Sequence, residues 1–172
     1  MELLPGVTAH DIDTDRLRVH YLESGAPDGI PVILVHGNLS TGRFYETVMS
    51  GAPEHFRFIA PDMRGFGRTE RKPLDATRGL RDWADDTYAL VQALGIEAPV
   101  HLAGWSTGGA AVAAYAMDRH VASVTFIDPV SPYGFGGCHR DGTPCFPDWA
   151  GTGGGTGNPE FVQRLQSQDR SG

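Results

Sequence analysis

The stretch GWSTGG, residues 104–109, places a serine between glycines where one apolar pattern ends and another begins. Before it, PVHLAGWS (99–106) reads as a buried strand, and after it, GGAAVAAYAMDRH (108–120) reads as a small-residue helix. Glycines two positions either side of Ser106 leave room for a sharp strand-to-helix turn, which strains the backbone at the serine. A GxSxG pattern in this context is typical of a serine nucleophile presented on such a turn.

Strand and helix patterns alternate on both sides of this stretch. We predict a hairpin over 7–23 with its turn at 13–15, strands at 31–37, 56–62 and 121–129, and helices over 41–50 and 77–94. This alternation predicts an α/β fold with a mostly parallel, doubly wound sheet and helices on both faces. Ligands of such folds bind beyond the carboxyl ends of the strands, where Ser106 is expected.

The pattern changes after residue 130. Residues 131–172 are rich in Gly and Pro, carry aromatic residues and show no period apart from one short helical pattern at 159–167. We therefore expect a core over 1–130 and the start of an irregular cap or lid over 131–172. The GTGGGTG run at 151–157 contains no GK[ST], does not complete GxGxxG and follows no strand, so nucleotide binding is not predicted there.

Composition excludes several classes of partner. The 172 residues carry 21 acidic and 14 basic side chains, a formal charge of -7, without a basic run. This balance argues against binding nucleic acid or an anionic membrane surface. No segment approaches the ~20 apolar residues that span a bilayer, and the N-terminal stretch lacks a signal-peptide pattern. We expect a cytoplasmic protein with a small-molecule ligand.

The two cysteines lie in the segment GGCHRDGTPCF. The DGTP turn between Cys138 and Cys145 allows either a local disulfide or two reduced thiols. Their spacing, without paired CxxC or a suitable histidine, predicts no zinc site, and no other metal or cofactor is predicted.

Two further motifs fall at the ends of predicted strands. HGN at 36–38 ends one strand, where the backbone N–H of Asn38 can complete an oxyanion hole together with the N–H of Thr107. PDMRGFGRT at 61–69 ends the next strand in a glycine-rich turn. All three motifs are expected at the same edge of the sheet.

With these motifs the sequence resembles the α/β-hydrolase superfamily over about residues 7–130. The resemblance implies that Ser106 is the nucleophile, that Asn38 and Thr107 supply backbone oxyanion contacts, and that a mobile cap follows the strand ending at Asp128. Dehalogenases and many epoxide hydrolases of the superfamily carry Asp at the elbow, whereas this chain carries Ser106. Acyl transfer through a serine ester is therefore favoured over alkyl-enzyme chemistry.

The family order of catalytic groups is Ser, then acid, then His. Only His120 and His139 follow Ser106; the first is predicted at the far end of the helix and the second in the lid, so neither is favoured as the base. His36 is expected to shape the oxyanion loop, and His101 to be a packed core residue.

The resemblance also implies two strands after the cap that this sequence does not contain. We therefore expect the chain to be the N-terminal portion of the fold, completed by a C-terminal half that carries the histidine, in the same polypeptide or as a separate chain. Without that half, the strand at 121–129 would be an open edge. The acid is either Asp128 or a residue beyond Gly172.

The favoured function is a cofactor-free serine hydrolase that cleaves a carboxylic ester, lactone or thioester. Carbon–carbon bond hydrolysis or perhydrolysis at the same site is a second possibility, and a ligand-binding protein without turnover is a third. Trp105 and Phe66 are candidates to line the acyl pocket, and the lid aromatics Phe135, Phe146 and Trp149 are candidates to close it.

Overall fold

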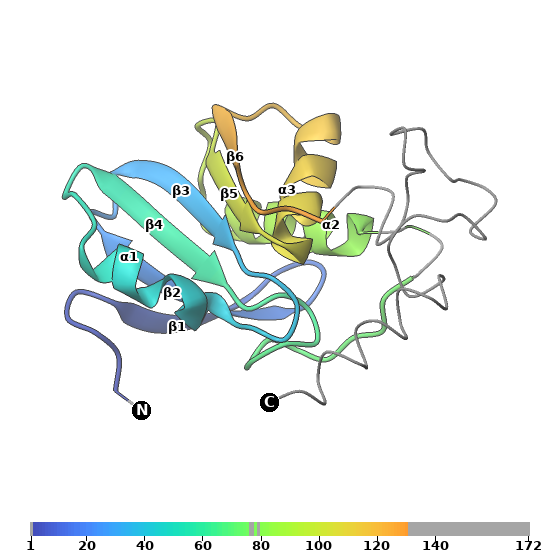
Figure 1. Ribbon diagram of the computed structural model, residues 1–172, viewed down its shortest axis with the longest axis horizontal. Coiled ribbons are helices and arrows are strands. Elements are labelled where there is room, and N and C mark those ends of the chain that lie inside the picture. Colours follow the sequence, from blue (N-terminus) through green and yellow to red (C-terminus); the bar gives the residue numbers. More distant parts are fainter. Residues whose placement is uncertain (1, 76–77, 79, 131–172) are drawn as a thin grey trace, which may run out of the picture. The chain divides into compact units, whose positions relative to one another are not determined.

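The computed structural model describes residues 2–75, 78 and 80–130, which form a single sheet flanked by helices (Figure 1). The strands are β1 (Thr8–Asp13), β2 (Arg18–Gly25), β3 (Ile30–Val35), β4 (Phe56–Pro61), β5 (His101–Trp105) and β6 (Ser123–Ile127). The helices are the 3₁₀ turn η1 (Gly42–Tyr45), α1 (Glu46–Ser50), α2 (Arg81–Ala93) and α3 (Thr107–Asp118).

The sheet has the strand order β1-β2-β4-β3-β5-β6. β4, β3, β5 and β6 run parallel to their neighbours, and the β1–β2 hairpin joins β4 in antiparallel fashion. This confirms the predicted hairpin and the mostly parallel α/β sheet. Because Val35 pairs with Gly104 and Trp105 pairs with Ile127, the carboxyl ends of β3, β5 and β6 meet at one edge.

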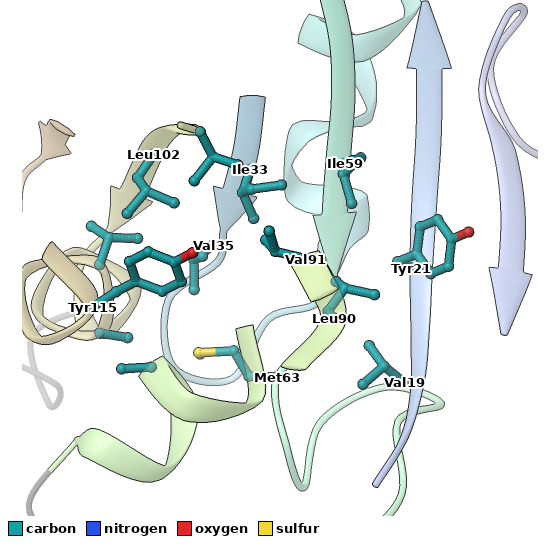
Figure 2. Close-up of a cluster of buried hydrophobic side chains, with 14 of the residues drawn as sticks. Val19, Tyr21, Ile33, Val35, Ile59, Met63, Leu90, Val91, Leu102 and Tyr115 are labelled. Atoms are coloured by element: carbon teal, nitrogen blue, oxygen red, sulfur yellow. The ribbon is translucent and has the colours of Figure 1, made fainter. Parts of the chain in front are cut away.

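The two faces of the sheet are covered by different helices, as the period-two alternation of strand side chains requires. Figure 2 shows the larger core, in which Ile33, Ile59 and Leu102 from three strands meet Leu90 of α2 and Tyr115 of α3. A smaller core on the other face is formed by the intervening strand residues, η1 and α1; it comprises Val7, Leu22, Leu34, Tyr45, Met49, Ala60 and Ala103. Helices therefore pack on both faces, as predicted.

Two predicted helices differ from the observed ones. The segment predicted as one helix over 41–50 is a 3₁₀ turn followed by a five-residue α-helix. The helix predicted from residue 77 begins at Arg81. The backbone N–H of Asp75 donates to Asp82 Oδ2 at 2.8 Å, so Asp75 is bound to the first turn of α2.

β6 forms one edge of the described sheet and pairs there with β5. Its side chains are largely exposed, with Phe126 at 52% and Ile127 at 38% of their maximal exposure. Within residues 2–75, 78 and 80–130, no helix is long and apolar enough to cross a membrane. The predicted lid, its helix and aromatic residues, His139, Cys138 and Cys145 lie outside the described residues.

Candidate active site

Ser106 occupies the sharp turn between β5 and α3. It is half-buried, and its backbone has φ 53° and ψ −118°, a conformation that L-residues rarely adopt. Its N–H donates to Ile127 O at 3.1 Å, and its carbonyl accepts from Gly109 N at 3.0 Å. A strained non-glycine residue fixed by its neighbours in this way is a recurrent feature of functional sites.

The glycines of the motif are required by close backbone contacts. A Cβ atom on Gly108 would lie 2.2 Å from Val35 O and 2.4 Å from His36 O, and one on Gly104 would lie 2.4 Å from Gly108 O. These obstacles are backbone atoms, which cannot move aside as a flexible side chain can. The glycines thus let α3 begin directly against the end of β3, which is the steric role predicted for them.

The loop after β3 lies against the serine. A Cβ atom on Gly37 would be 3.0 Å from Ser106 Cβ and 2.6 Å from the Trp105 ring, so backbone and serine approach closely there. Asn38 follows and is exposed, with its Oδ1 accepting from Leu39 N at 3.0 Å. Thr107, the first residue of α3, carries one of the N–H groups that have no acceptor within a helix. Of the two predicted oxyanion residues, Thr107 directly follows Ser106, and Asn38 directly follows Gly37, whose backbone approaches the serine.

His36 is fully buried beside this loop, and both of its ring nitrogens are engaged. Nδ1 lies 2.7 Å from Gly37 O, and Nε2 accepts from Met63 N at 2.9 Å. Burial lowers the pKa of His36, although the Gly37 carbonyl and the Asp62 carboxylate oppose this shift. The ring shapes the turn, as predicted, and has no free nitrogen to act as a base.

Neither His101 nor His120, the other described histidines considered for this site, hydrogen-bonds to Ser106. The prediction that His101 is a core residue is wrong: it is half-exposed, with Nδ1 2.8 Å from Ser123 Oγ on the neighbouring strand β6. His120 follows the end of α3 opposite the elbow. Among the described residues, no side chain hydrogen-bonds to Ser106 Oγ.

Asp128 directly follows β6, whose Ile127 carbonyl holds the Ser106 N–H. It is exposed and has a φ of 44°, a positive φ that it shares with Leu39 and Ser106 at this edge of the sheet. Asp128 therefore lies in the neighbouring strand turn, within the part of the sheet where an acid is expected.

Aromatic residues pack beside the loop after β3 and the turn after β4. Trp105 stacks on Phe44 with ring centroids 4.2 Å apart and an interplanar angle of 4°. Phe66 packs edge-on against His36 at 5.4 Å. Of the two predicted pocket aromatics, Trp105 thus lies against Gly37 in the loop after β3, and Phe66 packs against the buried His36.

The turn after β4 holds a charged network that sequence analysis missed. Asp62 accepts from the N–H of Gly42 and of Arg68, both at 2.8 Å, which joins this turn to the loop after β3. Arg64 donates two hydrogen bonds of 2.7 Å to Asp86 on α2, and both side chains are more than 90% buried. The DMRG motif was visible in the sequence, but nothing in it indicated the partner on α2.

Metal ligation finds no support in the part of the chain that the structure covers. Within residues 2–75, 78 and 80–130, there is no group of three or more His, Cys, Asp or Glu side chains placed to hold a metal ion.

Comparisons with known proteins agree with this geometry. The family model described as the alpha/beta hydrolase fold matches residues 30–152, and the chain belongs to this family. It is 34% identical over 111 residues to cis-3-alkyl-4-alkyloxetan-2-one decarboxylase of Xanthomonas campestris pv. campestris, covering 60% of this chain and 37% of that protein. It is 32% identical over 123 residues to the non-heme chloroperoxidase of Streptomyces lividans, covering 69% and 44%.

Solved structures show the same fold. The epoxide hydrolase CorEH without ligand superposes with a TM-score of 0.67 at 28% identity, covering 95% of this chain and 56% of that chain. The chain spans less than half the length of the two curated relatives. Family membership supports a hydrolase at the level of the enzyme class.

Proposed function

We propose that this chain carries the nucleophile and oxyanion hole of a serine hydrolase that cleaves a carboxylic ester, lactone or thioester. The observation that carries the proposal is the strained Ser106, with φ 53°, held between β5 and α3 and facing the Gly37 loop. Its hydroxyl is uncommitted among the described residues, whereas the polar groups of the adjacent turn are all engaged in structure.

The reaction follows from this arrangement. Ser106 Oγ attacks the carbonyl carbon while a base takes its proton, and the carbonyl oxygen becomes the oxyanion of a tetrahedral intermediate. The N–H groups of Asn38 and Thr107 donate to that oxyanion, supported by the positive end of the α3 dipole. Collapse breaks the bond to the leaving oxygen or sulfur, which receives the proton. Water then cleaves the acyl-serine by the same steps and releases the carboxylic acid.

The base is a histidine from outside the described residues, in a C-terminal segment that completes the sheet beside β6. This segment is supported by the position of β6 at the edge of the described sheet, where the side chains of Phe126 and Ile127 are exposed. Two positions are open for the acid that orients this histidine: Asp128, in the turn next to the elbow, and a residue of the completing segment.

A lactone is the substrate class with additional support. The decarboxylase relative is named for an oxetan-2-one, a four-membered cyclic ester. In a lactone the leaving alcohol stays tethered to the acyl group, so the acyl-enzyme and product form without loss of a fragment.

Perhydrolysis is the second candidate. The non-heme chloroperoxidase relative supports it, since hydrogen peroxide in place of water would release a peracid from the same acyl-serine.

Pre-steady-state kinetics tests the proposal. With a p-nitrophenyl ester and the full-length protein that contains these residues, an acyl-enzyme gives a burst of p-nitrophenol equal to the concentration of active sites whenever deacylation limits the rate. Mass spectrometry of the quenched reaction should find the acyl group on Ser106. Tight ligand binding without any acyl adduct would instead favour a protein that binds ligands without turnover.

A further inference from the structure

His36 lies between the oxyanion loop and the turn after β4, and its two contacts select one form of the ring. Met63 N–H is a donor, so Nε2, 2.9 Å away, must be unprotonated to accept its hydrogen bond. Gly37 O is an acceptor, so Nδ1, 2.7 Å away, must carry the proton. The surroundings therefore require the neutral imidazole with its hydrogen on Nδ1.

The Gly37 carbonyl is part of the peptide group that bears the Asn38 N–H. A peptide group is planar and trans, so its C=O and N–H point in opposite directions within one plane. A hydrogen bond that fixes Gly37 O therefore also fixes the direction of the Asn38 N–H. This peptide lies beside Ser106, because a Cβ added to Gly37 would come within 3.0 Å of Ser106 Cβ, closer than ordinary van der Waals contact.

We propose that His36 is a positioning residue, which aims the Asn38 N–H at the oxyanion by donating from Nδ1 to Gly37 O. The inference rests on the proposed function, because it assigns a task only if Asn38 N–H serves an oxyanion. Met63 N–H has the matching task of holding the ring in the donating tautomer.

Neighbouring contacts hold the ring and the far end of the loop. Phe66 packs edge-on against the imidazole, with centroids 5.4 Å apart. Asp62 Oδ1 accepts from Gly42 N at 2.8 Å, which fixes the end of the loop farthest from His36. The loop between Gly37 and Gly42 is thus held at both ends by the turn after β4, and the end nearest Ser106 is held by the imidazole.

Protonation would break this arrangement. A second proton on Nε2 would face the Met63 N–H, donor against donor, and the ring would have to move. Burial lowers the pKa of His36, while the Gly37 carbonyl and Asp62, the charged group acting on it from the turn after β4, raise it. The net shift of the His36 pKa is downward. The neutral ring with both hydrogen bonds is therefore fully populated above the ordinary pKa of about 6.5, and it is lost as the pH falls through the lowered pKa of His36.

Two isosteric substitutions separate the two hydrogen bonds. In His36→Asn the amide nitrogen occupies the position of Nδ1, which preserves donation to Gly37 O and removes the acceptor for Met63 N–H. In His36→Gln the amide oxygen occupies the position of Nε2, which preserves that acceptor and removes the donor to Gly37 O. Each variant leaves one buried backbone group unpaired, so a purely structural role predicts similar losses in both.

We expect His36→Gln to lower kcat by about 10- to 100-fold with little change in KM, a part of the 10²- to 10³-fold effect of losing an oxyanion donor. His36→Asn should keep at least about tenfold more of kcat than His36→Gln. The assay is p-nitrophenyl ester hydrolysis by the full-length protein, with thermal unfolding of each variant measured in parallel.

The outcomes distinguish failure of the His36 positioning role from failure of the proposed serine mechanism. Wild-type turnover with equal kcat losses in both variants would contradict the positioning role and leave the serine mechanism intact. No turnover that depends on Ser106 in the wild type would contradict the proposed function, and the positioning role with it. If the variants do not fold, ¹⁵N NMR of the His36 ring in the unmodified protein decides: the Nδ1–H tautomer is expected, and Nε2–H or a protonated ring at pH 7 would overturn the proposal.

Discussion

The turns after β4 and β5 lie at the same edge of the sheet but are shaped by different means. The turn after β5 is shaped by backbone contacts and glycines: Gly108 packs on Val35 O, and Ser106 is held through its own N–H and carbonyl. The turn after β4 is shaped by side chains, with Asp62 accepting two backbone N–H groups and Arg64 bound to Asp86. The first turn leaves its functional side chain uncommitted, and the second commits its polar side chains to structure.

This difference separates function from stability in the molecule. A hydroxyl that supports nothing can be removed without unfolding the protein, whereas a carboxylate that holds neighbouring segments cannot. The two turns should therefore respond oppositely to substitution, and the following predictions test this in order of expected size.

The largest effect is expected at the serine. Ser106→Ala should lower kcat by about 10⁴-fold or more, because the nucleophile of the acyl-enzyme is lost. Its free energy of unfolding should change by less than about 0.5 kcal/mol, since no described side chain hydrogen-bonds to the hydroxyl. Ester hydrolysis and urea unfolding measure both quantities. A destabilisation of several kcal/mol would show that this turn, too, depends on its side chain.

The buried carboxylate on α2 should show the reverse. Asp86→Ala leaves Arg64 without its bidentate partner in an environment where both side chains are less than 10% exposed, and should destabilise the protein by about 3–5 kcal/mol. Arg18→Ala is the matched control, because Arg18 is 63% exposed and lies 3.5 Å from Asp11; it should cost at most about 1 kcal/mol. Equal losses in the two variants would argue against a structural role for the buried pair.

Gly108 tests the backbone contacts of the elbow. Gly108→Ala forces a Cβ to within 2.2 Å of Val35 O, which should destabilise the protein by about 2–3 kcal/mol and shift the elbow. Gly51→Ala provides the control, as the nearest atoms to its Cβ lie 3.9 Å away and little change is expected. If both variants unfold at the same urea concentration, close packing does not determine the turn.

Alkaline pH should destabilise the packing around the turn after β5. Tyr45 donates from its hydroxyl to Val35 O, the carbonyl on which Gly108 packs, at 2.9 Å. Burial raises the pKa of Tyr45 to about 12, so its contribution is complete below pH 10 and is lost as the pH rises from 10 toward 12. We expect a loss of about 2 kcal/mol that is absent from Tyr45→Phe.

Comparison of urea unfolding between pH 9 and 11.5 isolates this effect, because burial also raises the pKa of Tyr21 and Tyr115 in both proteins. If the free energy of unfolding falls equally with pH in wild type and in Tyr45→Phe, the raised pKa of Tyr45 does not cause the loss.

The sequence predicted those features that depend on local pattern. The elbow, the hairpin and the alternation of strands and helices could be predicted because glycine spacing and hydrophobic period are local properties. The start of α2 could not, because hydrophobic period does not reveal contacts of its first turn such as the hydrogen bond from Asp75 N–H to Asp82 Oδ2. His101 was misplaced because strand hydrophobicity does not reveal which positions of a strand stay partly exposed.

The polar partners near the site were also beyond sequence reasoning. Arg64 and Asp86 are 22 residues apart, and His36 and Met63 are 27 apart. Each pair is brought together by the crossover between β3 and β4 or between β4 and α2, so only the folded chain shows which groups face each other. The HGN and DMRG motifs indicated where His36, Met63 and Arg64 lie and gave no indication of their partners.

The central claim is that the elbow presents Ser106 as an activated nucleophile. Labelling with a fluorophosphonate probe followed by peptide mass spectrometry tests it directly on the full-length protein. The account predicts one covalent adduct per chain, located on Ser106 and absent from Ser106→Ala. No adduct, or an adduct on another serine that persists in Ser106→Ala, would contradict it.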